Sequence, residues 1–437
     1  MQQNLHAIRG AVLSYAADPF QYDIKSSMNY ESDAIIIISD GTISQFGPYN
    51  TLLSTLPENL AITHYQDSII MAGFIDCHVH YPQTQIIAAF SRQLIDWLDK
   101  YSFIAEQQFK NKQHAHEVSK IFLQECLRNG TTTTANFCTV FPESVDAFFE
   151  QSEKLNMRNI AGKLMMDRNA PDNLLDTPQQ SYDESKALIN KWHANGRQLY
   201  CVSPRFAPTS SAEQMDMAGQ IWQEHPGTYL QSHISENINE LAWVKQLFPQ
   251  CSSYLDVYDQ YGQLGPRAIY GHGIYLTEEE LQRCHDTGTA IAHCPTSNLF
   301  LGSGLFNIAN AMKAERPVRV GLATDLGAGT SFSMLQTMNE AYKVAQLNGC
   351  PLSSGQAFYL ATGASARALY LDDKVGNIAP GMEADIVVLD LNSTPIIEYR
   401  MQYCDNIEEM LFVLMTMGDD RAVRATYIAG NLVYNRE

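Results

Sequence analysis

The sequence predicts an α/β protein with a TIM-type (β/α)8 barrel at its centre and a small β-sandwich domain formed from both termini. Short apolar runs alternate with longer amphipathic segments from residue 72 to residue 375. Several of these runs end in a histidine or an aspartate, and short strand-like segments flank the region on both sides. Strands that alternate with helices pair in parallel, and eight of them close into a barrel.

We expect eight barrel strands, at residues 75–80, 131–137, 160–166, 199–206, 229–233, 268–272, 289–293 and 318–325. Helical periodicity fills most of the gaps, as at residues 144–155, 181–192 and 212–224. In such barrels the active site lies at the C-terminal ends of the strands. Polar residues at those ends are therefore the candidates for function.

The flanking regions have a different pattern. Residues 33–47 contain a strand, an Asp-Gly turn and a second strand, which is typical of a β-hairpin. Residues 381–390 and 425–434 are also short strands beside turn residues. We therefore expect the β-domain to comprise residues 1–71 and 376–437, and the barrel to comprise residues 72–375.

The first predicted barrel strand ends in His78 and His80, two residues apart. Residues i and i+2 of a strand project from the same face, so both imidazoles can bind one metal ion. A second pair, His114 and His116, lies in a polar stretch predicted to be helical, where positions i and i+2 diverge. We interpret that second pair as a solvated helix face.

Three later strands each carry one polar residue near their C-terminal ends, namely His233, His272 and Asp325. A lone histidine or aspartate is usually a core or turn residue. Three such residues after a His-x-His strand instead predict a metal-dependent active site.

Composition limits the classes of function. The 437 residues are 45% hydrophobic and 18% charged, enough for a large core. The net charge of −19 and the lack of a basic cluster argue against nucleic acid as a partner. No apolar run could span a membrane, the chain begins polar, and the nine cysteines are scattered without Cys-x-x-Cys spacing. We expect a cytoplasmic protein without a membrane partner.

The order of these histidines and the aspartate resembles the amidohydrolase superfamily. Four longer motifs resemble, more closely, its guanine deaminases; they cover residues 165–172, 203–211, 233–237 and 293–304. The resemblance implies hydrolysis of guanine to xanthine and ammonia. It also implies one zinc ion per subunit, with iron(II) as the alternative, and a homodimer.

The predicted metal ligands are three imidazoles and one carboxylate, from His78, His80, His233 and Asp325. These donors suit zinc and leave one position for water, whose pKa the metal lowers toward ~7. Asp325 can then take a proton from that water, and His272 can orient it. Glu236 is predicted to shuttle protons to the ring and to the leaving amine. The alternative for Glu236 is a carboxylate stabilised by a helix N-terminus.

Substrate recognition rests mainly on the resemblance. Arg205 and Gln83 could read the edge of guanine that carries O6, N7 and N1–H, and Phe206 could stack on the ring. Without the resemblance, a surface arginine with a stacked neighbour and an ordinary loop glutamine would explain these residues equally well. We expect His233, Glu236 and Asp325 to contact the substrate as well.

The same motifs bear on other functions. A two-metal hydrolase would need a lysine or glutamate at the end of the fourth strand, which ends instead in Ser-Pro-Arg-Phe, while Lys163 lies on the third. A cytidine-deaminase fold would need a Pro-Cys-x-x-Cys motif, which is absent. Deamination of cytosine, a triazine, a pterin or another purine remains an alternative. A non-enzymatic assembly protein on the same barrel is a remote one.

Overall fold

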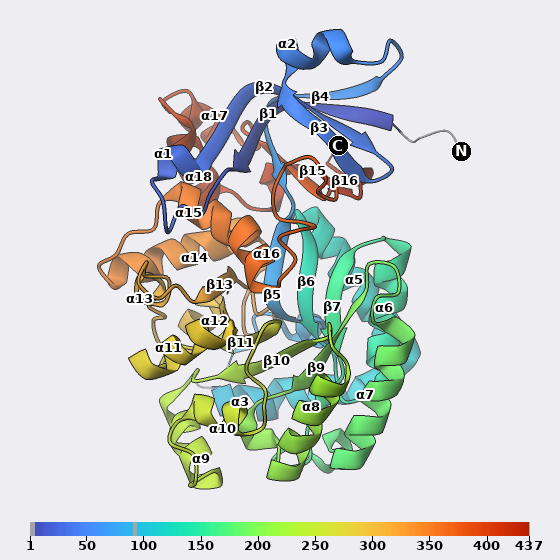
Figure 1. The fold of residues 1–437 in the computed structure, drawn as a ribbon, viewed down its shortest axis with the longest axis vertical. Helices are drawn as coiled ribbons and strands as arrows, with labels where there is room; N and C mark the ends of the chain where they lie inside the picture. The colour runs from blue at the N-terminus through green and yellow to red at the C-terminus, as the bar shows by residue number, and fades with distance from the viewer. Residues whose placement is uncertain (1–4, 91–93, 437) are drawn as a thin grey trace.

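The computed structural model describes residues 5–90 and 94–436, and Figure 1 shows two parts. The larger part is a barrel whose strands are surrounded by helices. The smaller part is a β-domain at the top of the view, and it contains strands from both the beginning and the end of the described chain. Among the described residues, no helix combines the length and the apolar character needed to cross a membrane.

The predicted (β/α)8 barrel is confirmed. Its strands pair in parallel in the order β13-β12-β11-β10-β9-β7-β6-β5, with β8 beside β9. Their bounds are β5 Phe74–His80, β6 Thr131–Phe137, β7 Arg158–Gly162, β8 Leu164–Met165, β9 Leu199–Pro204, β10 Tyr229–Ile234, β11 Ala268–His272, β12 Ala290–His293 and β13 Arg319–Leu322. The two ends of this order meet where the backbone N–H of Asp325 donates to the carbonyl of His78 at 3.0 Å.

Helices cover the outside of the barrel as the periodicity predicted. The helices α6 (Pro142–Lys154), α7 (Pro178–Trp192) and α8 (Ala212–Glu224) connect successive strands. Proline occupies the first turn of α6 and α7, where its missing N–H costs nothing. Along α6 the residues spaced three and four apart are buried against the sheet, among them Val145, Phe148 and Phe149. Figure 1 shows α6 and α7 along the right flank.

The β-domain from both termini is also confirmed, and its strands form one mixed sheet of seven in the order β16-β15-β14-β4-β1-β2-β3. The strands are β1 Leu5–Tyr15, β2 Met28–Ser39, β3 Thr42–Pro48, β4 Ala61–Ala72, β14 Ile386–Asp390, β15 Val423–Ile428 and β16 Asn431–Asn435. The predicted hairpin joins β2 and β3 through Asp40 and Gly41, both at positive φ. Two successive residues at positive φ are typical of a type I′ turn.

The β-domain is held at the N-terminal side of the barrel strands. Only Gly73 separates β4 from β5, so the first barrel strand continues directly from the sheet. Arg197, which precedes β9, lies 2.6 Å from a carboxylate oxygen of Glu383 and 2.5 Å from one of Asp385. These contacts leave the C-terminal ends of the strands free to form a site.

Candidate active site

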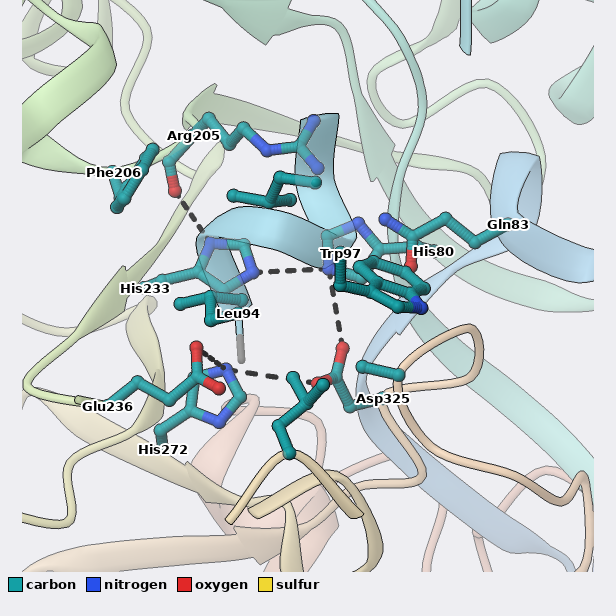
Figure 2. A pocket seen from close by; sticks show the side chains of 13 residues that line it. His80, Gln83, Leu94, Trp97, Arg205, Phe206, His233, Glu236, His272 and Asp325 are labelled. Carbon is teal, nitrogen blue, oxygen red and sulfur yellow. Dashed lines mark hydrogen bonds and ion pairs between the residues drawn. The ribbon is translucent and has the colours of Figure 1, made fainter. Parts of the chain in front are cut away.

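A cavity opens at the C-terminal ends of the barrel strands. It contains most of the side chains that the sequence singled out, as Figure 2 shows. The predicted residues on its wall are His80, Gln83, Arg205, Phe206, His233, Glu236, His272 and Asp325. His78 is not part of the wall, and its imidazole is buried next to that of His233.

The four predicted ligands converge from β5, β10 and the end of β13. The Nε2 atom of His233 lies 3.1 Å from the Nε2 atoms of both His78 and His80. The Oδ1 atom of Asp325 lies 3.6 Å from Nε2 of His78 and 3.4 Å from Nε2 of His80. Donors about 2.0–2.1 Å from a tetrahedral zinc ion lie about 3.3 Å from one another. The spacing of these donors therefore fits a metal ion.

The protonation of the imidazoles fits a metal as well. Burial, reinforced by the neighbouring imidazoles, lowers the pKa of His78, His80 and His233 well below the usual range, so all three are neutral. The Nδ1–H of His233 donates to the backbone carbonyl of Arg205 at 2.6 Å. That hydrogen bond leaves the lone pair of Nε2 directed at the other ligands.

Sequence reasoning missed Cys294 at this site. The structure places its thiol beside the site. One ligand atom each from His78, His272, Cys294 and Asp325 lies within 4.8 Å of the others. The signal was present in the sequence, because Cys294 directly follows the last residue of β12 and the predicted ligands also lie at or near strand ends.

Two site residues have strained backbones. His272 has φ 74° and Asp325 has φ 48°, in the left-handed region that costs a non-glycine residue about 1–3 kcal/mol. Asp76 stabilises the second of these turns, since its Oδ1 accepts the backbone N–H of Thr324 at 3.0 Å. The strained turns direct both side chains into the pocket.

Glu236 is buried and faces His272. Its Oε1 accepts a hydrogen bond from the hydroxyl of Ser303 at 3.0 Å, and its Oε2 lies 3.5 Å from Nε2 of His272. Burial raises the pKa of Glu236 to about 7. The helix-terminus alternative has little support, because Asn237 and Glu240 form the capping box of the following helix α9 (Ile238–Leu247). Glu236 is thus a carboxyl group that can hold a proton near neutrality.

One hydrogen bond at Nδ1 orients the imidazole of His272. Its Nδ1 lies 2.8 Å from Oδ1 of Asn298, a residue that sequence reasoning did not single out. The opposite ring atom, Nε2, faces Oδ2 of Asp325 at 3.8 Å. An imidazole held between two carboxyl groups can position a small polar molecule there.

The rest of the pocket wall combines a polar side with an apolar cover. Arg205 and Gln83 form the polar side, and both donate to the hydroxyl of Ser102. Sequence reasoning found no signal for the segment of residues 94–106, which also supplies Leu94, Trp97 and Leu98 to the wall. Phe206 lies on the wall as predicted.

The structure also places the two features that the sequence analysis set aside as metal ligands. Lys163 is fully buried between β7 and β8 and forms ion pairs with Asp176 and Glu184. The second histidine pair is half-buried on α5 (Lys112–Arg128) rather than fully solvated, and Nε2 of His116 lies 2.8 Å from Glu150. Neither feature belongs to the metal-ligand clusters found among the described residues.

A glycine in β11 makes room for His78. A methyl group built on Gly271 would lie 2.5 Å from Cε1 of His78, closer than any real contact. We expect Gly271→Ala to displace that imidazole and to lower metal content and activity together, at an overpacking cost of about 1–3 kcal/mol in stability. Metal analysis and thermal denaturation test this. Gly47→Ala is the control, since its methyl meets Leu52 at an ordinary 3.5 Å; full metal content in Gly271→Ala would contradict the prediction.

Comparison with known proteins identifies the family. A family model described as the amidohydrolase family matches residues 69–433. The chain belongs to the amidohydrolase family. It is 47% identical over 436 residues to the guanine deaminase of Escherichia coli, covering 100% of this chain and 99% of that protein. It is 34% identical to a probable guanine deaminase of Deinococcus radiodurans, covering 98% of each. Within the amidohydrolases, this chain therefore groups with the guanine deaminases.

Solved structures of amidohydrolases agree. The E. coli guanine deaminase matches with a TM-score of 0.95 at 46% identity, covering 99% of this chain and all of that one. A guanine deaminase from C. acetobutylicum, solved with guanine in its active site, matches with a TM-score of 0.87 at 28% identity and the same coverage. The resemblance found in the sequence is thereby confirmed.

Proposed function

We propose that this protein is a guanine deaminase that hydrolyses guanine to xanthine and ammonia. The observation that carries the proposal is the 47% identity to the E. coli guanine deaminase over the full length of both chains. The pocket supports it, because a buried metal-binding cluster, a protonatable carboxyl group and a polar wall face one cavity. We also infer that the protein acts as a cytoplasmic homodimer, as its resemblance to this enzyme group implies.

Four residues are proposed to hold a zinc ion, with iron(II) as the alternative: His78, His80, His233 and Asp325. A divalent metal bound there supplies the Lewis acidity that makes water a nucleophile at neutral pH. His272 orients the attacking water through Nε2. Asp325, whose Oδ2 faces His272, accepts the proton that the water gives up.

Glu236 is proposed to supply protons to the purine. Deamination of an aromatic ring requires one proton on a ring nitrogen, so that the carbon becomes electrophilic, and one on the departing amine. A buried carboxyl group with a raised pKa can give its proton to the ring nitrogen, regain one from the hydroxyl group that water has added to the ring, and pass it to the amine. The hydroxyl of Ser303 holds Oε1, which leaves Oε2 on the side of His272.

Arg205, Gln83 and Phe206 are proposed to recognise guanine. The carbonyl edge of guanine offers O6 and N7 as acceptors, which a planar guanidinium can bind together. Gln83 fits closely against the turn after β13, since a methyl group on Gly327 would lie 2.1 Å from its Oε1. Phe206 provides a ring face, and Leu94, Trp97 and Leu98 add apolar side chains to the pocket wall.

The substrate assignment is tested by following ultraviolet absorbance as the metal-loaded protein converts guanine to xanthine. We expect guanine to be preferred over adenine, cytosine, a triazine, an aminopterin and the nucleosides of the bases by at least about tenfold in kcat/KM, because one missing hydrogen-bond partner costs that much or more. A preference for another substrate would replace guanine and leave the metal site in place. Absence of bound metal together with no ammonia release would favour the assembly protein.

A further inference from the structure

We propose that Glu106 is a positioning residue that fixes Arg205 and neutralises its charge, so that the pocket favours neutral guanine over an anionic purine. The relevant anion is deprotonated xanthine, the product of the proposed reaction. This inference rests on the proposed function and deepens it. Sequence reasoning assigned no role to Glu106.

The side chains of Arg205 and Glu106 form a buried ion pair with two short hydrogen bonds. Nη1 of Arg205 donates to both carboxylate oxygens of Glu106, at 2.8 and 2.7 Å. The side chain of Arg205 is 3% exposed and that of Glu106 is 1% exposed. Arg205 lines the cavity, whereas Glu106 lies behind it at the end of α4 (Phe103–Glu106). Figure 2 shows Arg205 across the pocket from Glu236 and His272.

One short segment holds the guanidinium on several sides. The hydroxyl of Ser102 accepts from Nη2 of Arg205 at 3.1 Å and donates to Glu106 at 2.8 Å. The ring of Phe103 lies 5.4 Å from Cζ of Arg205, within the range of a cation–π contact. A guanidinium has five N–H donors. The three hydrogen bonds leave two of them without a partner among the described residues, and these two are available to a ligand.

Neutralising the charge of Arg205 has different effects on the binding of substrate and product. Guanine is neutral, whereas xanthine carries a second carbonyl where guanine has its amino group. That carbonyl makes the ring N–H groups more acidic, so the product gains negative charge as the pH rises. A hydrogen bond from a guanidinium to an anion is about twice as strong as one to a neutral acceptor. An arginine without its carboxylate partner would therefore retain the product anion.

Two variants separate charge from hydrogen bonding. Glu106→Gln keeps an acceptor for Arg205 but removes the negative charge, and Ser102→Ala removes one hydrogen bond from the same guanidinium without changing charge. For the metal-loaded enzyme, KM for guanine, kcat and the inhibition constant of xanthine are measured from pH 6 to pH 9. In Glu106→Gln we expect the ratio of the inhibition constant of xanthine to the KM for guanine to fall roughly tenfold at the alkaline end of this pH range. The difference should shrink at the acid end, where xanthine is neutral.

Ser102→Ala is expected to raise KM while leaving that ratio and its pH dependence as in the wild type. The kcat of both variants, measured on the chemical step, should change less than KM. Equal ratios in Glu106→Gln and wild type at every pH would overturn the proposal. So would an equal shift in both variants, because geometry alone would then explain it.

A third variant keeps the test decisive if Glu106→Gln does not fold. Glu106→Asp retains the negative charge and should keep the wild-type selectivity against xanthine even where KM rises; loss of that selectivity would contradict the proposal. Xanthine binding to metal-loaded wild type and variants is also measured by calorimetry, which requires no turnover. Failure of the wild type to deaminate guanine would remove the proposed function, whereas the calorimetric comparison decides the role of Glu106 separately.

Discussion

Glu236→Gln is expected to keep its metal and its fold and to lose roughly 10²–10⁴-fold in the rate of the chemical step, the usual contribution of a general acid–base group. The amide has the same shape and can still accept the hydroxyl of Ser303, but it cannot carry a proton. Burial raises the pKa of Glu236, so in the wild type we expect kcat/KM to fall on the alkaline side, as the proton is lost. The residual activity of the variant should lack this alkaline decrease.

A neighbouring carboxyl group provides the control for this experiment. Glu240 is also buried with a pKa raised to about 7, yet its Oε2 caps α9 through the backbone N–H groups of Glu236 and Asn237. Glu240→Gln should lower the stability of the protein, while the rate of the chemical step should fall by less than about tenfold. Single-turnover rates at several pH values distinguish the two residues. If Glu236→Gln fell by less than tenfold, Glu236 would be structural.

The largest loss of activity is expected when a predicted metal ligand is removed. Asp325→Asn and His233→Ala should each reduce metal content and activity together, to the limit of detection. Asp325→Asn removes the only carboxylate of the predicted set, and His233→Ala removes the imidazole whose Nε2 lies 3.1 Å from two others. Elemental analysis of the purified variants, beside the guanine assay, measures both quantities.

His293→Ala controls for the loss of a buried imidazole from the same barrel. His293 packs against Phe306 and is not part of the clusters of possible ligands found among the described residues. We expect this variant to lose stability but to retain its metal. Full metal content with near-normal turnover in either ligand variant would show that the ligand assignment is wrong.

The barrel and its polar strand ends were predictable because both depend on local patterns. Apolar strands alternate with amphipathic helices, and β5, β10 and β11 each carry a histidine at or next to the last residue. Parallel pairing then brings those ends together whatever the connecting loops contain. The same reasoning correctly placed the hairpin of β2 and β3, whose Asp-Gly turn is a local signal.

The other features depend on contacts between distant segments. Glu106 follows no strand, and its partner Arg205 lies 99 positions further along the chain. Asn298 contacts His272 only because α12 (Pro295–Phe300) begins beside the end of β11. In the β-domain, β4 lies between β1 and β14, and no pattern within these strands specifies that order.

The contact between the first and last barrel strands determines when the proposed metal site can form. Asp76 and Thr324 meet there although 248 positions separate them, and the backbone of Asp325 is bonded to His78. During synthesis, the first two imidazoles therefore emerge long before the carboxylate that completes the set. A nascent chain lacking residue 325 cannot form the full cluster. If the proposed ligands are right, tight metal uptake would report that translation has passed β13 and that the ring of strands has closed.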